Sequence, residues 1–290
     1  MQLSIIIPTW NGKHLLEQML PSLIRSLAVF QDSEIIVVDN GSTDETVAFV
    51  KEVYPKIKVR TLPKNKGFSG AVSQGAEHAQ GTWLVFLNND CYLYPDTIEK
   101  MMHLVQSNSD IIATSPVILK SGKTSLIENA GYVVDLKKGK AEVVTDINFP
   151  RKNKEETTIP DGAGMTHVAF RSGKVYGLSG TCLLIRRDVY ETVGGFDPAF
   201  HSYLEDVDLC IRLAKAGYRY AITPDAFCDH KHMATSSRMG LYKQRQDFKN
   251  WIRIIVKNYP FSFLLRNSPT LLVERLRNVN GLIKKSFLAH

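Results

Sequence analysis

Short apolar runs alternate with longer amphipathic segments along the first 115 residues of the chain. The apolar runs cover about residues 3–7, 34–38, 58–62, 82–87 and 111–114. They are too short for helices and fit buried parallel strands. The segments between them predict helices that end near residues 26, 53, 80 and 107, the second of them opened by a capping box at residues 42–45. This alternation predicts parallel β-α-β units with right-handed crossovers, which is the organisation of a nucleotide-binding half.

The pattern is less regular between residues 116 and 240. Residues 120–175 are rich in Lys, Gly and Thr and predict short antiparallel strands with a mobile segment, including an exposed loop at 150–154. After them we expect a strand at 178–185, a short helix at 187–193 stopped by two glycines, a helix at 205–216 and a strand at 218–222. The whole pattern predicts an α/β fold with a mostly parallel sheet flanked by helices.

The composition narrows the class of protein. The 290 residues suffice for one large α/β domain or two small ones. No apolar run reaches about 18 residues, so we expect no conventional membrane span. The first residues lead directly into a strand without a basic segment, which argues against a signal peptide. The four cysteines are far apart, which disfavours a zinc ribbon or a disulfide framework and makes the reducing cytoplasm the default: Cys91, Cys182, Cys210 and Cys228.

Positive charge is concentrated at the C-terminus. Residues 241–290 contain ten Lys and Arg against Asp247 and Glu274, a local net charge of +8 in a chain whose total is +7. Apolar and basic residues alternate there, and a second helix is expected to begin at residues 267–269 with Pro269 at its first position. Such an extension suits an anionic membrane surface, or it is a helix pair packed on the domain with a solvated basic face. Nucleic acid is a weaker alternative because no binding motif accompanies the charge.

Small polar residues follow the predicted strand at 82–87. They are Asn88, Asn89 and Asp90, and Asp39 follows another predicted strand in the same way. In open α/β sheets, ligands bind beyond the carboxyl ends of such strands. Asp90 can offer an oxygen to a divalent cation, while the two Asn side chains can hydrogen-bond sugar hydroxyls or order the turn. A plain Asn-Asp turn is the alternative.

Three acids open the predicted helix at 205–216. Capping of the helix dipole explains Asp208, because Arg212 lies four residues later on the same face. Glu205 and Asp206 are adjacent acids whose burial is costly unless a cation or an acceptor hydroxyl compensates. A functional role is therefore predicted for Asp206. The helix dipole opposes a role as a base, since it lowers the pKa of a carboxylate.

Two histidines follow the last predicted strand of the domain and a predicted turn at Pro224 and Asp225, in the order Asp229, His230, Lys231, His232. A His-x-His pair can supply two nitrogen ligands to one metal, or one ligand beside a supporting group. An exposed loop is the alternative. Asp90 as a second ligand favours a metal role for His230.

Six motifs in sequence order resemble those of family 2 glycosyltransferases, closest to a bacterial rhamnosyltransferase-like branch. The resemblance covers about residues 3–260, and each motif is weak by itself whereas six in order are specific. They lie at residues 5–11, 36–44, 65–68, 86–90, 194–197 and 205–209.

The resemblance implies a GT-A fold, a nucleotide-diphosphate sugar donor, a Mg²⁺ or Mn²⁺ ion and inversion at the anomeric carbon. It assigns the contacts with the base and ribose to Pro8, Thr9, Asn11 and Asp39. It also implies that Gly67 lets the backbone approach the nucleotide closely. Asn88, Asn89 and Asp90 correspond to the family's Asp-x-Asp element, whose first acid is Asn here, as is common in this branch. Ser73 stands where many relatives have Asn and His201 where many have Phe, which bears on donor or acceptor preference.

The expected reaction is a single displacement at the anomeric carbon. A cation held by Asp90 and His230 would stabilise the leaving diphosphate. The acceptor hydroxyl needs a base, for which Asp206 is the candidate, with Glu205 orienting acceptor or sugar. Gly180 and Thr181 are expected near the acceptor. The branch resemblance suggests a deoxythymidine-diphosphate rhamnose donor and a glycan or lipid-linked acceptor in cell-surface polysaccharide synthesis.

These expectations divide the chain into a GT-A domain at residues 1–240 and a basic helical extension at 241–290. The domain would have a nucleotide-binding half at 1–115 and an acceptor half at 116–240. The expected location is cytoplasmic, with peripheral contact to the inner face of the cell membrane through the extension.

Three other classes were weighed against a glycosyltransferase. A sugar-nucleotide pyrophosphorylase would need a Gly-rich basic loop near the first strand, and a dehydrogenase would need Gly-x-Gly-x-x-Gly there. Residues 8–13 supply neither. A non-catalytic nucleotide-sugar-binding protein is the strongest rival, and the presence of Glu205, Asp206 and His230 argues against it.

Overall fold

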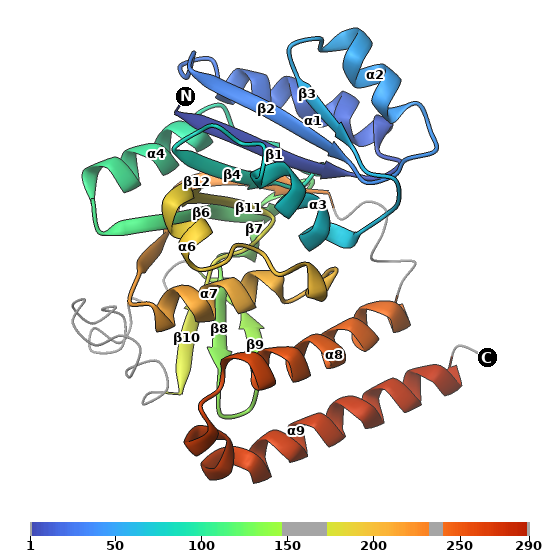
Figure 1. Cartoon of the computed structure of the whole chain (residues 1–290), viewed down its shortest axis with the longest axis vertical. Helices are drawn as coiled ribbons and strands as arrows, with labels where there is room; N and C mark the ends of the chain where they lie inside the picture. The colour runs from blue at the N-terminus through green and yellow to red at the C-terminus, as the bar shows by residue number, and fades with distance from the viewer. Residues whose placement is uncertain (1, 147–172, 232–239, 289–290) are drawn as a thin grey trace.

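A mixed β-sheet forms the centre of the molecule in the computed structural model, which describes residues 2–146, 173–231 and 240–288 (Figure 1). Within these residues the sheet has nine strands. They are β1 (Leu3–Thr9), β2 (Ser33–Asp39), β3 (Lys58–Thr61), β4 (Trp83–Leu87), β5 (Cys91–Leu93), β6 (Ile111–Lys120), β7 (Lys123–Asn129), β11 (Cys182–Arg186) and β12 (Arg219–His230). Their spatial order is β3-β2-β1-β4-β11-β6-β12-β5, with β7 paired to β6.

The first four strands form the parallel part of the sheet. β1 pairs in parallel with β2 and β4, and β2 pairs in parallel with β3. The predicted parallel β-α-β units are therefore confirmed. Their carboxyl ends lie together, since the pairing aligns Thr9 with Asp39 and places Leu87 on the neighbouring strand. Polar residues that follow these strands consequently share one edge of the sheet.

The second half of the sheet is interleaved with the first. β11 lies antiparallel between β4 and β6, and β12 pairs in parallel with β6 and antiparallel with β5. The predicted strand at 218–222 continues as β12 to His230, with a shift of register between Thr223 and Phe227. The expected turn after that strand is therefore wrong, because Pro224 is accommodated in a bulge and pairing then resumes. His230 ends a strand instead of lying in a loop.

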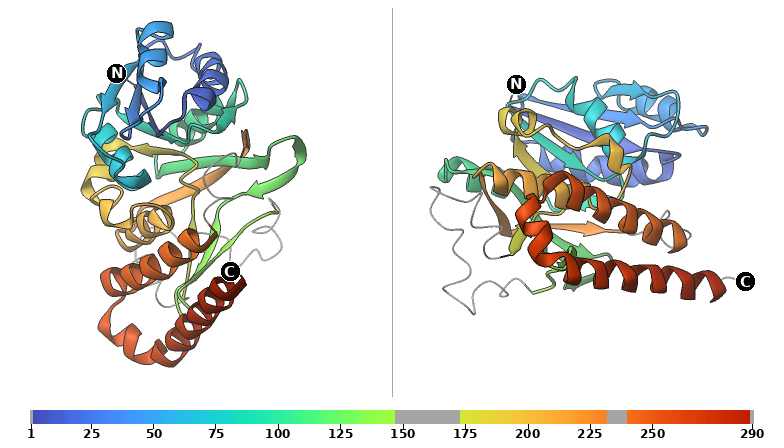
Figure 2. Two further views of the ribbon diagram at one scale, coloured as in Figure 1. Left: turned by 90° about the vertical axis from the view of Figure 1, so that its right-hand side faces the viewer. Right: turned by 60° about the horizontal axis from the view of Figure 1, so that its bottom comes forward.

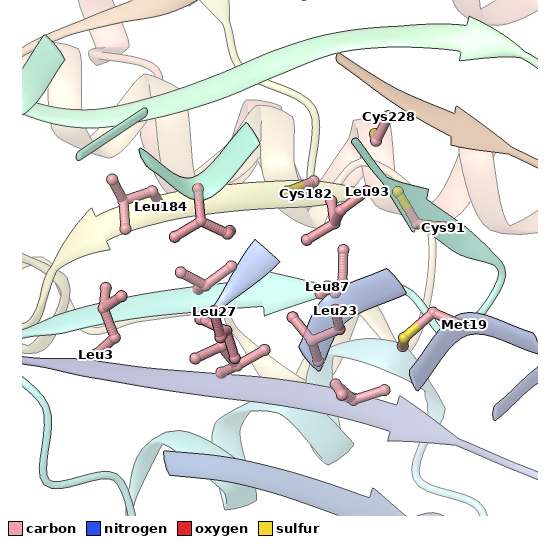
Figure 3. Close-up of a cluster of buried hydrophobic side chains, with 14 of the residues drawn as sticks. Leu3, Met19, Leu23, Leu27, Leu87, Cys91, Leu93, Cys182, Leu184 and Cys228 are labelled. Atoms are coloured by element: carbon pink, nitrogen blue, oxygen red, sulfur yellow. The ribbon is translucent and has the colours of Figure 1, made fainter. Parts of the chain in front are cut away.

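Helices cover both faces of the sheet. One face carries α1 (Lys13–Ser26), α2 (Thr46–Val53) and α4 (Thr97–Ser107), and the other carries α3 (Gly67–Ala76), α6 (Arg187–Thr192) and α7 (Glu205–Lys215). Side chains alternate along β1, so Ile5 and Ile7 pack on the first face and Ile6 on the second. Figure 3 shows part of the first core, where Cys91, Cys182 and Cys228 lie among leucines. All four cysteines are buried free thiols.

The predicted capping box at the start of α2 is wrong. The Ser42 hydroxyl accepts a hydrogen bond from the backbone N–H of Asn11 at 2.8 Å, so it is committed to the loop after β1. The helix begins at Thr46, whose backbone N–H donates to Asp44 Oδ1 at 3.1 Å. The side chains that the pattern assigned to a helix cap instead tie two strand-end loops together.

A smaller antiparallel sheet lies below the central one and consists of β8 (Tyr132–Asp135), β9 (Lys140–Val143) and β10 (Lys174–Gly177), in the order β10-β8-β9. It confirms the short antiparallel strands expected in this region. The predicted exposed loop at 150–154 lies outside the described residues. A short 3₁₀ helix, η2 (Pro198–Phe200), precedes α7.

Two long helices, α8 (Gly240–Asn258) and α9 (Phe261–Leu288), end the chain. They pack against each other at the end of the molecule opposite α2, and α8 also packs on α7 (Figures 1 and 2). Their buried side chains, which include Trp251, Ile254 and Leu271, join Phe200 and Val207 in one apolar cluster. Among the described helices, none is long and apolar enough to cross a membrane.

The predicted start of the second tail helix is wrong. α9 begins at Phe261, and Pro269 lies inside it. A proline there leaves the carbonyl four residues earlier without its usual N–H partner. The Ser268 hydroxyl donates to that carbonyl, Leu265 O, at 3.2 Å, so the helix continues through the proline.

Candidate active site

One cleft of about 940 Å³ opens at the carboxyl ends of β1 and β4. This volume lies in the range of small-ligand sites. The cleft brings together twelve of the residues that the sequence had singled out, namely Pro8, Thr9, Asn11, Gly67, Asn88, Asn89, Asp90, Gly180, Thr181, Glu205, Asp206 and His230. Asp90 and Asp206, more than a hundred positions apart in the chain, therefore face the same cavity.

Asp39 is the predicted site residue that does not line this cleft. Its side chain is almost fully buried at the end of β2. Oδ1 accepts a hydrogen bond from the backbone N–H of Ser42 at 3.1 Å, while Oδ2 is buried and has no hydrogen-bond partner among the described residues. Ser73 also lies away from the cleft, and its hydroxyl donates to the backbone oxygens of Ser69 and Phe196.

The loops after β1 and β4 are tied to each other by short polar side chains. The Asn89 amide donates to Thr9 Oγ1 at 2.9 Å. Asn11 has a positive φ of 48°, and its Oδ1 accepts from the backbone N–H of Thr43 at 2.8 Å. Asn readily adopts this conformation because its side chain can bond to nearby backbone. The Asn89 amide therefore ties the loop after β4 to the end of β1.

Gly67 begins α3 with a φ of +74°. A Cβ at this position would lie 2.5 Å from Cγ of His201, so a larger residue would collide with that ring. The His201 Nδ1 in turn lies 3.0 Å from the Tyr242 hydroxyl on α8. The glycine thus allows a close approach between α3 and the loop that leads to Glu205.

Asp90 and His230 lie next to each other at the ends of β4 and β12. His230 Nε2 is 3.3 Å from Asp90 Oδ1, and His230 Nδ1 is 2.9 Å from Glu128 Oε1. Burial lowers the pKa of His230, but the hydrogen bonds to Asp90 and Glu128 outweigh it and raise the pKa to about 9. The second histidine of the predicted pair, His232, lies outside the described residues.

This oxygen and nitrogen pair fits a divalent cation once the imidazole has released the proton that its raised pKa favours, since only neutral imidazole binds a metal. Ligands on adjacent corners of an octahedron around an ion such as Mg²⁺ lie roughly 3 Å apart. Within the described chain there is no group of three or more His, Cys, Asp or Glu side chains placed to hold a metal. Mg²⁺ in nucleotide enzymes is commonly held by one or two carboxylates, with waters and phosphate oxygens completing the shell.

Glu205 and Asp206 line the same cleft from the start of α7, and both are buried. Asp206 accepts hydrogen bonds from the backbone N–H groups of Gly180 and Val207, at 3.0 and 2.8 Å. Burial raises the pKa of Asp206 and outweighs these hydrogen bonds. Burial, with the charge of Asp206 second, raises the pKa of Glu205 well above its ordinary value. The expected lowering by the helix dipole is thus overcome, and the acids are stronger bases than the sequence suggested.

Sequence reasoning missed several residues of the cleft. Glu128 contacts His230, Tyr132 lines the cleft and partly offsets the burial-driven rise in the pKa of Asp206, and Asp247 of α8 lines the cleft with a pKa raised by burial. A signal existed for Asp247, which is one of only two acids in a basic extension. No sequence signal pointed to Glu128 or Tyr132, because their positions in the cleft depend on how β7 and β8 pair.

A mixed sheet with a cleft at the carboxyl ends of its parallel strands, lined by Asp90 and Asp206, has the architecture of the GT-A fold. The model of "Glycosyl transferase family 2" matches residues 4–194, and that of "Glycosyl transferase family group 2" matches residues 148–290. The chain belongs to glycosyltransferase family 2, which confirms the resemblance described above.

The chain is similar to named enzymes of several organisms. It is 29% identical over 251 residues to the N-acetylglucosaminyl-diphospho-decaprenol L-rhamnosyltransferase of Mycobacterium tuberculosis, covering 81% of this chain and 77% of that protein. It is 32% identical over 153 residues to the dolichol-phosphate mannosyltransferase of Pyrococcus furiosus, covering 52% of this chain and 42% of that one.

Solved structures share the fold at low sequence identity. GalNAc-T7 with UDP, GalNAc and Mn²⁺ aligns with a TM-score of 0.65 and 17% identity over 88% of this chain, which spans 47% of that protein. The mannosyltransferase PcManGT of Pyrobaculum calidifontis with GDP-Man and Mn²⁺ aligns with a TM-score of 0.56 and 18% identity, covering 99% of this chain and 78% of that one. These likenesses confirm the predicted GT-A fold.

Proposed function

We propose that this glycosyltransferase moves a sugar, with rhamnose as the first candidate, from a nucleotide-diphosphate donor to a hydroxyl of a glycan or lipid-linked acceptor, with inversion at the anomeric carbon. The observation that supports the proposal is the cleft itself, which Asp90, His230, Glu205 and Asp206 line together. The named rhamnosyltransferase relative supports rhamnose and a role in cell-surface polysaccharide synthesis.

The donor is proposed to lie along the ends of β1, β2 and β4. The base and ribose would contact Pro8, Thr9 and Asn11 and pass close to Gly67, with Asn88 and Asn89 beside the sugar diphosphate, while Asp39, which is buried outside the cleft, would act only by ordering the loop after β2. Asp90 and His230 would hold Mg²⁺ or Mn²⁺, and the bound ion would stabilise negative charge on the leaving diphosphate. The Mn²⁺ complexes of two structural neighbours support this role.

Asp206 is proposed as the base that removes the proton of the acceptor hydroxyl. A hydroxyl is too weak an acid to ionise at neutral pH and needs a base within hydrogen-bond reach during attack. The buried carboxylate of Asp206 is oriented by the N–H of Gly180, so the acceptor would enter beside Gly180 and Thr181. Glu205 would orient the acceptor or the sugar. A single displacement of this kind inverts the anomeric carbon.

Assays with a panel of nucleotide sugars, with and without Mn²⁺, test the proposal. A donor present at 100 times its dissociation constant should stabilise the fold by about 2.7 kcal/mol in a thermal-shift measurement. Sugar transfer or donor hydrolysis should accompany binding, and Asp206→Asn should fold, bind donor and lose about 10² to 10⁴ in turnover. Donor binding without transfer or hydrolysis would instead identify a non-catalytic nucleotide-sugar-binding protein.

We further propose that the outer face of α9 rests on an anionic membrane surface on the cytoplasmic side. Four large apolar side chains recur at spacings of four and seven residues and are exposed on one side of this helix: Phe261, Leu265, Leu272 and Leu276. Exposed basic residues, Arg266 and Arg277, accompany them, a combination typical of interfacial helices. Because α9 also lines the cleft with Arg275 and Asn278, a lipid-linked acceptor could stay in the bilayer while its sugar reaches Asp206.

Vesicle sedimentation with matched variants tests the membrane contact. Leu265→Ser with Leu272→Ser alters two side chains that are 63% and 60% exposed on α9. Val29→Ser with Val53→Ser is the control, because these side chains are 65% and 55% exposed and lie shortly after α1 and at the end of α2 instead of on the C-terminal helices. We expect the first pair alone to reduce binding to phosphatidylglycerol vesicles. Equal binding by both pairs, or a first pair that changes only the oligomeric state, contradicts the proposal.

A further inference from the structure

The loop that delivers Glu205 and Asp206 to the cleft has an unusual backbone. His201, Tyr203 and Leu204 have φ values of 61°, 70° and 66°. Residues other than glycine rarely adopt positive φ, and such conformations persist only where the surrounding structure holds them. Leu204 is also the residue from which α7 starts, so the backbone of this loop sets where the first turn of the helix lies.

One side chain of α8 holds this loop. Asn250 is fully buried, and its amide nitrogen faces three carbonyl oxygens, Phe200 O at 3.0 Å, Ser202 O at 2.9 Å and Tyr203 O at 2.7 Å. Its Oδ1 accepts a hydrogen bond from Nη1 of Arg253 at 2.8 Å, which fixes the orientation of the amide. Asn250 therefore contacts the backbone of this loop from Phe200 to Tyr203.

The opposite side of the loop is held by the start of α3. The backbone N–H of Ser69 donates to His201 O at 3.1 Å, and that of Phe68 donates to the Ser202 hydroxyl at 3.4 Å. Gly67 leaves the room that His201 occupies. The loop is therefore clamped between a helix on the donor side of the cleft and α8 of the C-terminal extension.

We propose that Asn250 is a positioning residue for the transfer reaction, which acts by holding residues 200–204 in the conformation that places Glu205 and Asp206 in the cleft. The catalytic consequence rests on the proposed roles of these two acids. α8 would then belong to the catalytic unit, although the sequence predicted a domain that ends at residue 240.

Asn250→Leu is the test, with Asn258→Leu as its matched control. Asn258 is the same residue type on the same helix and is also buried, but its amide donates to Asp208 Oδ1 at 2.8 Å and not to the loop. Both variants lose a buried polar contact and are expected to lower the melting temperature. Asn250→Leu alone should speed hydrogen exchange at residues 201–206, measured on the whole chain without donor.

Turnover gives the second readout. With deoxythymidine-diphosphate rhamnose and Mn²⁺, Asn250→Leu should lower kcat by about 10- to 100-fold, the effect of a small misplacement of reacting groups, and leave the donor KM within about threefold. Asn258→Leu should keep kcat within about twofold of the wild type. Should Asn250→Leu fail to fold, Asn250→Ser replaces it, because it leaves space for a bridging water.

Unchanged exchange in the loop of the Asn250 variant overturns the clamp. Faster exchange with a wild-type kcat, or an equal loss of kcat in the Asn258 variant, overturns the positioning role. The exchange measurement needs no substrate, so a wild-type protein that transfers no sugar would refute the proposed function while the clamp is still decided by the loop.

Discussion

The backbone N–H of Gly180 donates a hydrogen bond to Oδ2 of Asp206 at 3.0 Å. Gly180 lies just before β11, and Asp206 lies in the first turn of α7. The proposed acceptor contact and the proposed base are therefore linked directly, because the backbone of Gly180 orients the carboxylate of Asp206.

This link makes Gly180 sensitive to a single added methyl group. A Cβ at Gly180 would lie 3.2 Å from Cβ of Asp206, which is closer than ordinary contact, so Gly180→Ala should shift the carboxylate by a few tenths of an ångström. We expect kcat to fall by about 3- to 10-fold while donor affinity in calorimetry stays the same. Gly281→Ala is the control, because its Cβ meets nothing within 4 Å. Equal rates for the two variants would argue that Asp206 is not placed by Gly180.

The raised pKa values of Glu205 and Asp206 predict the pH profile. A base works in its deprotonated form, so the rate falls as the pH drops through its pKa. Because burial raises both pKa values, the acid limb of kcat/KM should lie above the range of an ordinary carboxyl group. The limb will belong to the coupled pair, since two adjacent acids titrate together. Initial rates between pH 4.5 and 8 measure it, and an acid limb near pH 4 would contradict the assignment.

Glu205→Gln should make the protein more stable and less active. The folded-state pKa of Glu205 is raised, so the native state binds a proton that the unfolded chain releases, and ionised Glu205 costs stability above the folded-state pKa. Gln carries no charge, and we expect a gain of about 0.5–2 kcal/mol at pH 7.5. The gain should shrink as the pH falls through the raised pKa. Urea unfolding of the wild type and the variant at pH 7.5 and pH 5 would measure the difference in unfolding free energy at each pH. A less stable variant at pH 7.5 would show that the negative charge of Glu205 is compensated in the folded protein.

Asp90→Ala should abolish Mn²⁺-dependent nucleotide binding in calorimetry. Asp90 offers the carboxylate beside His230, and a cation held there would bridge to the diphosphate. The control is Asp96→Ala, which removes an exposed acid paired with Lys100 and should bind as the wild type does. Unchanged binding by Asp90→Ala would remove this residue from the metal site.

The parallel half of the fold was predictable because its signals are local. Each strand of β1, β2 and β4 is buried on both faces, which produces the continuous apolar runs read from the sequence. Their polar ends then fall at one edge by the geometry of parallel pairing. For the same reason Asp90 and Thr9 could be assigned to one cleft without coordinates.

The rest depends on contacts that local patterns do not contain. Pro224 signals a turn, yet pairing with β6 carries β12 past it and puts His230 at the end of a strand. Pro269 signals a helix start, yet the Ser268 hydroxyl satisfies the carbonyl that the proline leaves unpaired. Asn250 gives no signal at all, since its partners lie about fifty residues earlier in the chain. Each of these outcomes is set by tertiary neighbours.

The insertion of β11 between β4 and β6 limits how this enzyme could be recombined. A fragment of the first 115 residues would contain only the start of β6. In that fragment β4 would be an open edge strand, because its neighbour β11 (residues 182–186) would be missing. A hybrid that borrowed its donor half from another glycosyltransferase would also have to match the backbone bond from Asn88 N–H to Thr181 O, 2.9 Å long, across the join. The residues proposed to contact donor and acceptor thus belong to one continuous sheet, so directed evolution of either preference should start inside the cleft rather than by exchanging halves.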